Sequence, residues 1–209
     1  EERNGPSNSP AARHEKAGEA IRLIALINDV SLRGILSTEF AKGLGPVQGK
    51  AATAFSPVAA TPDELGSAWD GHRVLRPITV HVNDKPLGTP DCGRDMQFDF
   101  PHLIAHAAKT RRLGAGTVLG SGTISNQKHE SGFACIAELR ASEAARKGEL
   151  TPFLRFGDRV RIDMLDAAGL SIFGAIDQPV AQYPAPRKVV DVPPENDDGG
   201  SVNEGGGIN

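Results

Sequence analysis

Hydrophobic and polar residues alternate most clearly in the segment 77–87, where Ile78, Val80 and Val82 are apolar and the residues between them are polar. This period of two is typical of a half-buried strand. The pair Asn83-Asp84 follows and suits a tight turn, so the segment predicts a β-hairpin. Further along, a second hairpin is predicted by a strand pattern at 159–165, a turn at 166–169 and a partner strand at 170–177.

Two other stretches have the composition of helices. Residues 18–27 are almost continuously apolar and rich in helix formers, so they predict a buried helix whose end delivers Asp29. Residues 99–112 predict a second helix, with Asp99 as its N-cap and basic residues near its C-terminal end, where they complement the helix dipole. The glycines and proline within residues 34–50 predict a loop.

The remaining regular segments are short. Residues 53–59, 116–125 and 132–140 predict strands, and Pro62 begins a predicted helical turn. The chain contains 24 Gly and 15 Pro, a content that indicates many turns and favours β-structure.

The length of 209 residues suits one domain with tails. Residues 1–16 are polar and predict a lead-in, and residues 17–183 predict the folded domain. Residues 184–209 lose their periodicity and fill with Pro, Gly, Asn and Asp, a composition that predicts a disordered tail.

Composition and charge exclude several classes of protein. The net charge of −3 and the pI near 6.1 leave no basic surface for nucleic acid, and the 5% of aromatic residues are too few for base stacking. No apolar run approaches the roughly 20 residues that span a membrane, and the polar start of the sequence does not resemble a signal peptide. Cys92 and Cys135 lack the spacing of a zinc site or of a disulfide framework, which predicts free thiols in a cytoplasmic protein.

Candidate chemistry gathers between Ile27 and Pro57. Asp29 offers a carboxylate to a divalent cation, and Arg33 and Lys50 offer positive charge to an anionic substrate. Spacing alone does not separate this set from abundant surface charge.

Four other patterns do not establish a site by themselves. Gly120–Thr123 is rich in glycine, but no helical run with a Lys follows, so a phosphate-binding loop is disfavoured. His102 and His106 have chelating spacing but no third ligand nearby in sequence, and are interpreted as solvated or packing residues. Glu138 either faces solvent from the predicted strand 132–140 or is partly buried with a partner. No serine stands in a nucleophile elbow, which disfavours a serine hydrolase.

Four ordered motifs together resemble the fumarylacetoacetate hydrolase family, in its C-terminal catalytic domain. They are NDVSLRG (28–34), QGKAATAFSP (48–57), GTVLGSGTISN (116–126) and FLRFGDRVRIDML with GLSIFGAID (within 153–177). The likeness runs from about Gly18 to Val180. It implies a mainly β fold with a minority of helices, namely a fumarylacetoacetase-like mixed β-sandwich roll. It also implies a homodimer that holds Mg²⁺ or Ca²⁺ through carboxylates.

The resemblance implies roles for single residues. Asp29 matches the family's metal-ligand Asp, and Lys50 and Thr53 match residues assigned to the same metal site. Arg33 and Lys50 are implied to hold the substrate and the leaving enolate. Thr123 is implied to contact the substrate carboxylate, and Glu138 to orient a catalytic His.

The implied function is a metal-dependent hydrolase that cleaves a C–C bond in a fumarylacetoacetate- or acylpyruvate-type diketo acid, as in aromatic amino acid catabolism. Some relatives are lyases or isomerases of keto acids, such as decarboxylases and hydratases, and these remain an alternative.

Several family positions have no counterpart here. The family's Glu-x-Glu metal ligands and its catalytic His lie N-terminal to the position of Asp29, and His14 is too close to Asp29 in sequence to match that His. The family's substrate-contacting Gln and Tyr correspond to Leu36 and Phe40. The expectation is therefore an N-terminally truncated member, and a further hypothesis is a non-catalytic remnant of the fold.

Overall fold

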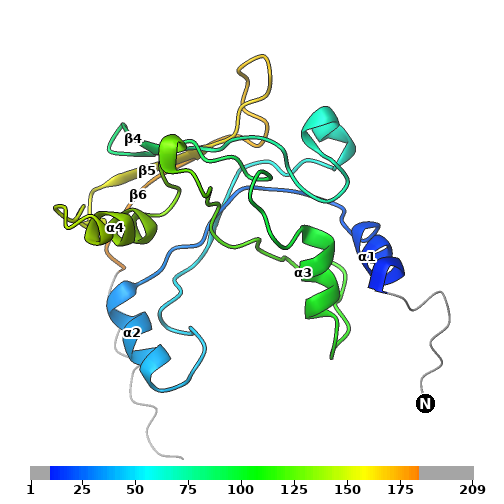
Figure 1. Cartoon of the computed structure of the whole chain (residues 1–209), viewed down its shortest axis with the longest axis horizontal. Coiled ribbons are helices and arrows are strands. Elements are labelled where there is room, and N and C mark those ends of the chain that lie inside the picture. Colours follow the sequence, from blue (N-terminus) through cyan, green and yellow to red (C-terminus); the bar gives the residue numbers. More distant parts are fainter. Residues whose placement is uncertain (1–9, 184–209) are drawn as a thin grey trace, which may run out of the picture.

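An antiparallel sheet of four strands, in the order β4-β3-β5-β6, joins two distant parts of the chain. The computed structural model describes residues 10–183, and the sheet is seen at the upper left of Figure 1. Its strands are β3 (Thr79–Val82), β4 (Lys85–Gly88), β5 (Arg159–Asp163) and β6 (Ile176–Pro179).

β3 and β4 form the hairpin that the alternating pattern predicted. Asn83 and Asp84 connect them with φ angles of 51° and 62°, the left-handed conformation that a tight hairpin turn requires. Asn83 also fixes the turn to the start of β5, because its Oδ1 accepts from the Arg159 backbone N–H at 2.8 Å. The second predicted hairpin is confirmed in outline: β5 pairs with β6, although the regular part of β6 starts only at Ile176.

The two faces of the sheet differ in polarity. The register aligns Val80, Ile162 and Ile176 on one face, and His81, Arg161 and Asp177 on the other. The first face carries the core, which contains Ile24, Leu26, Leu65, Ala68, Val74, Ile78, Val80, Met164, Phe173 and Ile176. The sheet is therefore half buried, as its alternating sequence indicates.

Within the apolar stretch 18–27, Gly18 ends a helix that starts earlier in the chain and residues 19–20 form a turn, but residues 21–27 contain no helix, so the predicted helix there is wrong. Ile24 and Ala60 exchange backbone hydrogen bonds of 2.8 and 2.9 Å. Just beyond, β1 (Ile27–Asn28) pairs antiparallel with β2 (Ala54–Phe55), which confirms a short strand within residues 53–59. A continuous apolar run fits a buried extended segment as well as a buried helix. Here the backbone pairing of Ile24 and β1 with the segment that contains β2 favours the extended conformation over the helix.

The helical elements are α1 (Pro10–Gly18), α2 (Arg33–Ala41), η2 (Asp63–Ala68), α3 (Phe100–Ala107), η3 (His129–Ser131) and α4 (Ile136–Ala145). η2 confirms the helical turn predicted after Pro62. α3 begins as predicted, with Asp99 as N-cap, but ends at Ala107. α1 begins within the residues taken as a lead-in, and it lies beside α3 (Figure 1).

Three sequence predictions of local structure are corrected. α2 occupies the first half of the predicted loop 34–50, because the glycines that break the chain begin only after the helix has ended. Residues 116–125 pair in no ladder of the described chain, and Gly116 and Gly122 have φ angles near 80°, which an extended strand does not adopt. The predicted strand 132–140 is wrong, because the good helix formers from Ala137 onward lie in α4.

Gly88 and Gly132 bring β4 against the segment that leads into α4. They form an isolated antiparallel bridge, flanked by a hydrogen bond from the Thr89 backbone N–H to the Ser131 carbonyl at 2.6 Å. A Cβ atom at Gly88 would collide with the backbone of Phe133. This close approach, which only glycine permits, fixes the position of α4 relative to the sheet.

Helices and antiparallel strands both contribute substantially, so the described chain is a mixed α/β fold. The antiparallel β-structure that the sequence predicted is present, whereas a predominance of β-structure is not evident. The predicted disordered tail, residues 184–209, lies outside the described residues. Within residues 10–183, no helix has the length and apolarity needed to cross a membrane.

Candidate functional site

Asp29 and Lys50 form an ion pair at the open end of the β1–β2 ribbon. Lys50 Nζ lies 2.8 Å from Asp29 Oδ2 and donates to Ser31 Oγ at 2.9 Å. An isolated bridge between Ser31 and Lys50 extends the antiparallel pairing past Asp29. The Asp29 side chain is 52% exposed and that of Lys50 33%, so both groups remain accessible to a ligand. Sequence reasoning placed these two residues in one site, and the structure brings them into contact.

The loop that carries Lys50 is held by Glu39 of α2. The Glu39 carboxylate accepts hydrogen bonds from the backbone N–H groups of Val47 (3.1 Å), Gln48 (2.7 Å) and Gly49 (3.1 Å). Partial burial works against the charge of Glu39, but these three donors outweigh it and lower its pKa below the ordinary value of 4.5. Sequence reasoning did not identify Glu39, although an acid ahead of a glycine-rich loop is the signal that could have done so.

Gly49 fits where a larger residue would not. A Cβ atom there would lie 2.5 Å from Leu36 Cδ2 and 2.9 Å from Glu39 Oε2. The loop can therefore pack against α2 directly before Lys50 only because position 49 has no side chain.

Thr53 lies next to β2, and the register places it close to Asp29. Asn28 pairs with Ala54, so continuing the antiparallel register by one residue sets Thr53 opposite Asp29. Thr53 is half buried. The three residues assigned to the metal from sequence, Asp29, Lys50 and Thr53, thus come from the two segments that the β1–β2 ladder and the Ser31–Lys50 bridge hold side by side.

Arg33 begins α2 and points toward the start of α4. Its Nη2 donates to Cys135 Sγ at 3.8 Å, and Cys135 is the N-cap of α4. Both cysteines are free thiols, as the sequence predicted. Burial, with a smaller contribution from the charge of Asp91, raises the pKa of the Cys92 thiol to about 12, which favours the protonated thiol.

Glu138 lies in the first turn of α4 and is hydrogen-bonded to Ser125. Ser125 Oγ lies 2.6 and 2.7 Å from the two carboxylate oxygens. Of the two interpretations left open by the sequence, a partly buried acid with a partner is the one observed, on a helix instead of a strand. The two residues line a cavity of about 450 Å³, together with Asn126, His129, Phe133 and Arg146.

Thr123 lines a second cavity, of about 210 Å³, beside Asp95, Phe98 and Leu103. Ser125 lines both cavities, so the two adjoin along the segment 121–125. No polar contact within the described chain joins Thr123 to Asp29 or Lys50. The structure thus places Asp29, Lys50 and Thr53 around one ribbon and Arg33 in contact with the start of α4, while Thr123 and Glu138 line two different cavities that share Ser125.

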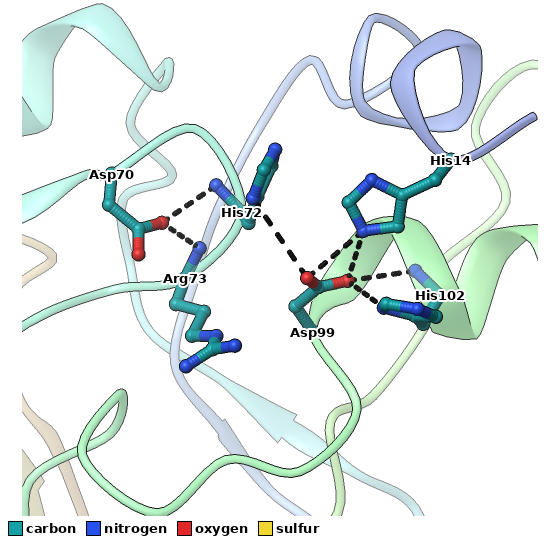
Figure 2. A network of polar contacts seen from close by, with 6 residues as sticks. All are labelled: His14, Asp70, His72, Arg73, Asp99 and His102. Carbon is teal, nitrogen blue, oxygen red and sulfur yellow. Dashed lines mark hydrogen bonds and ion pairs between the residues drawn. The ribbon is translucent and has the colours of Figure 1, made fainter. Parts of the chain in front are cut away.

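In a separate polar cluster, the side chains of His14, His72 and His102 surround the buried carboxylate of Asp99 (Figure 2). Asp99 is 4% exposed and caps α3, accepting from the His102 backbone N–H at 3.0 Å. Its Oδ1 also lies 2.9 Å from His14 Nε2 and 2.7 Å from His102 Nδ1. His72 Nδ1 is 3.9 Å from Oδ2.

Asp99 is held in its charged form. Burial opposes the charge, but the His102 N–H and the rings of His14 and His102 outweigh burial and lower the pKa of Asp99 to about 2. Sequence reasoning identified Asp99 only as an N-cap. It set His14 aside and paired His102 with His106, because nothing in the spacing of positions 14, 72 and 99 connects them.

Comparison with models of protein families matches residues 7–181 to the model described as "Fumarylacetoacetate (FAA) hydrolase C-terminal". No match is found among curated proteins. The matched range covers most of the chain and contains all four motifs on which the resemblance was based. The chain therefore belongs to the fumarylacetoacetate hydrolase family, in the region of its C-terminal domain.

Proposed function

We propose that this protein is a metal-dependent hydrolase that cleaves a C–C bond in a diketo acid of the fumarylacetoacetate or acylpyruvate type. The observation that carries the proposal is the contact of Lys50 Nζ with Asp29 Oδ2, at 2.8 Å. The two residues belong to two of the motifs that resemble the family, and members of this family are usually enzymes. An exposed carboxylate beside a fixed ammonium suits a divalent cation and an anionic substrate bound together.

The donor atoms at this site fit Mg²⁺ or Ca²⁺. Asp29 supplies carboxylate oxygens and Thr53 a hydroxyl, which are the hard donors that these cations take. Asp29 Oδ1 has no hydrogen-bond partner among the described residues, so it is free to ligate. Lys50 cannot ligate the cation, because an ammonium group has no lone pair to donate, so its part in the site is to hold Asp29 Oδ2 and to face the anionic substrate. A cation bound there supplies Lewis-acid polarisation of the chelating oxygens of a diketo acid.

The cationic side chains complete the electrostatics of the reaction. When the C–C bond breaks, one fragment leaves as an enolate, and positive charge close to its oxygen lowers the barrier. Lys50 is fixed for this role through Ser31 and the Glu39-held loop. Arg33, at the start of α2, is assigned to stabilise the same negative charge on the enolate oxygen.

Two residues outside the ribbon are assigned to substrate binding and to a positioning role. Thr123 offers a hydroxyl to the substrate carboxylate from the smaller cavity. Glu138, held by Ser125, is assigned the family role of orienting a water-activating imidazole, a His that has no counterpart in this sequence. The architecture proposed for the domain that carries this function is the fumarylacetoacetase-like mixed β-sandwich roll.

We further propose that the protein acts as a homodimer. Apolar side chains near the Asp29–Lys50 ribbon are exposed, with Phe55 at 50%, Val58 at 53% and Val47 at 67%. Exposed apolar surface of this kind marks protein interfaces. Light scattering during gel filtration tests the proposal, and a monomer at high protein concentration would contradict it.

The proposed reaction is tested by following the absorbance of an acylpyruvate during titration with Mg²⁺, with product analysis. Two carboxylic-acid fragments, formed only with the cation, are the expected result. Release of CO₂ or gain of water without cleavage would assign the protein to the lyases of the family instead. An intact substrate at saturating Mg²⁺ would overturn the enzymatic proposal for this chain.

A further inference from the structure

We propose that His14, His72 and Asp99 form a binding site for a transition-metal ion of the Zn²⁺ class, separate from the keto-acid site. The three residues come from α1, from the turn after η2 and from the start of α3. One ligand atom from each lies within 4.8 Å of the others. Figure 2 shows the rings of His14 and His72 directed at the Asp99 carboxylate from different sides.

The distances are close to those of a coordinated metal. Zinc bonds of roughly 2.0–2.1 Å in a tetrahedron place neighbouring ligand atoms about 3.4 Å apart. Here His14 Nε2 lies 3.0 Å from Asp99 Oδ2, and His72 Nδ1 lies 3.9 Å from the same oxygen. Side-chain shifts below about 1 Å would complete the geometry, which is within ordinary rotamer adjustment.

The donor set selects the class of metal. Two imidazole nitrogens and one carboxylate oxygen suit zinc and the neighbouring divalent transition metals, whereas Mg²⁺ and Ca²⁺ prefer oxygen alone. This site shares no residue with the Asp29–Lys50–Thr53 set, so the two are distinguished by both position and metal preference.

Local structure holds the three ligands in place. Asp70 Oδ1 accepts from the backbone N–H groups of His72 (2.8 Å) and Arg73 (2.6 Å), and so fixes the turn that presents His72 (Figure 2). Asp99 is fixed by its bond to the His102 backbone N–H. Supporting bonds of this kind orient metal ligands in known sites.

The cluster exceeds what helix capping requires. An N-cap needs one side-chain oxygen on one backbone N–H, and the bond to His102 already provides it. The rings of His14 and His72, 4.8 Å apart at their centroids, add nothing to that cap. Their side chains are 19% and 49% exposed, so an ion can enter from solvent and keep a water ligand. His102 Nδ1 lies 2.7 Å from Asp99 Oδ1 and further orients the carboxylate.

A metal bound here would connect α1 to α3 and to the turn after η2. Since a preformed site binds the folded chain better than the unfolded one, the ion raises stability by mass action. The inferred role is structural: the metal anchors the first helix of the described chain against the rest of the domain.

The test is titration of the full, tag-free, chelator-treated protein with Co²⁺ and then Zn²⁺. Co²⁺ is expected to give visible absorption bands of a nitrogen- and oxygen-ligated ion, which Zn²⁺ then abolishes by displacement. Zn²⁺ is also expected to raise the melting temperature. His72→Ala, at an exposed position, and His14→Ala should each weaken Zn²⁺ binding by about 10–100-fold or more. His106→Ala, on the exposed surface of α3, is the matched control and should bind like the wild type.

The outcomes separate cleanly. Absence of saturable binding, or binding that survives both His72→Ala and His14→Ala, would overturn the proposal and leave a hydrogen-bonded cap. If His14→Ala fails to fold, His72→Ala alone decides, because its turn is held by backbone bonds that the substitution leaves in place. None of these results depends on keto-acid turnover, so the proposed function stands or falls separately.

Discussion

Asp29 and Asp99 are both carboxylates paired with cationic or proton-donating side chains, yet their surroundings differ. Asp29 is half exposed, and Lys50 is the one side-chain partner it has among residues 10–183. Asp99 is 4% exposed and is surrounded by three histidines, the N-cap bond of α3 and the side of α1. The comparison indicates that an exposed pair is available for chemistry and contributes little stability, whereas a buried, multiply bonded carboxylate holds helices together.

The largest expected effect on stability follows from Asp99→Ala. The substitution removes the cap of α3 and strips His14 and His102 of their acceptor, so the free energy of unfolding should fall by about 2–3 kcal/mol. Urea denaturation of chelator-treated protein measures it. Asp99→Asn retains a capping oxygen and should lose less. If Asp99→Ala lowered the free energy of unfolding by less than about 0.5 kcal/mol, Asp99 would contribute no more stability than the exposed Asp29, which would contradict the comparison.

Gly49→Ala should have an intermediate effect. The added methyl group would meet Leu36 and the Glu39 carboxylate, and such overpacking costs about 1–2 kcal/mol. Gly45→Ala is the matched control in the same loop, because a methyl group added there would meet no atom within 4 Å. Equal unfolding free energies for the two variants would show that the loop is not packed as described.

Asp29→Ala should change stability little. An exposed ion pair contributes about 0–1 kcal/mol, so the variant should unfold nearly as the wild type does. Keto-acid turnover should nevertheless be lost, with Glu64→Ala as a control on another exposed acid. A destabilisation above about 2 kcal/mol would mean that Asp29 is a structural residue like Asp99.

The smallest predicted effect concerns pH and Glu39. Its pKa in the folded protein lies below the ordinary 4.5, so its bonds to the loop contribute stability above that pH. The contribution is lost as pH falls through the lowered pKa. The difference in unfolding free energy between wild type and Glu39→Gln should therefore be constant near neutrality and shrink under acid. If the difference in unfolding free energy grew on acidification, the pKa of Glu39 would not be lowered in the folded protein, and its hydrogen bonds to the loop would be contradicted.

Local sequence signals predicted those parts of the fold that depend on local chemistry. Asn83-Asp84 adopts the predicted turn, and Asp99 caps α3, because both roles depend on residues only a few positions away. The apolar stretch 18–27 was assigned to the wrong element because pairing with a distant segment, at Ala60, holds Ile24 in an extended conformation. The glycine-rich segment 116–125 was assigned to a strand, although Gly116 and Gly122 adopt positive φ angles.

The Asp29–Lys50 pair and the His14–Asp99 cluster also differ in how far they could be predicted from the sequence. Asp29, Ser31 and Lys50 lie on one ribbon, so a motif within a short stretch could indicate them. The His14–Asp99 contact joins residues 85 positions apart, and His72 lies between them on an irregular turn. No periodicity or spacing rule connects such positions, since the fold alone brings α1 and α3 together.

The central claim is that Lys50, beside Asp29, stabilises the charge that develops during cleavage of a keto acid. The most direct measurement is kcat for Lys50→Ala at saturating Mg²⁺, compared with Lys42→Ala at the exposed end of α2. The expected result is a loss of about 10²–10³-fold in kcat for Lys50→Ala with a much smaller change in KM, and wild-type kinetics for the control. An unchanged kcat for Lys50→Ala would contradict the account.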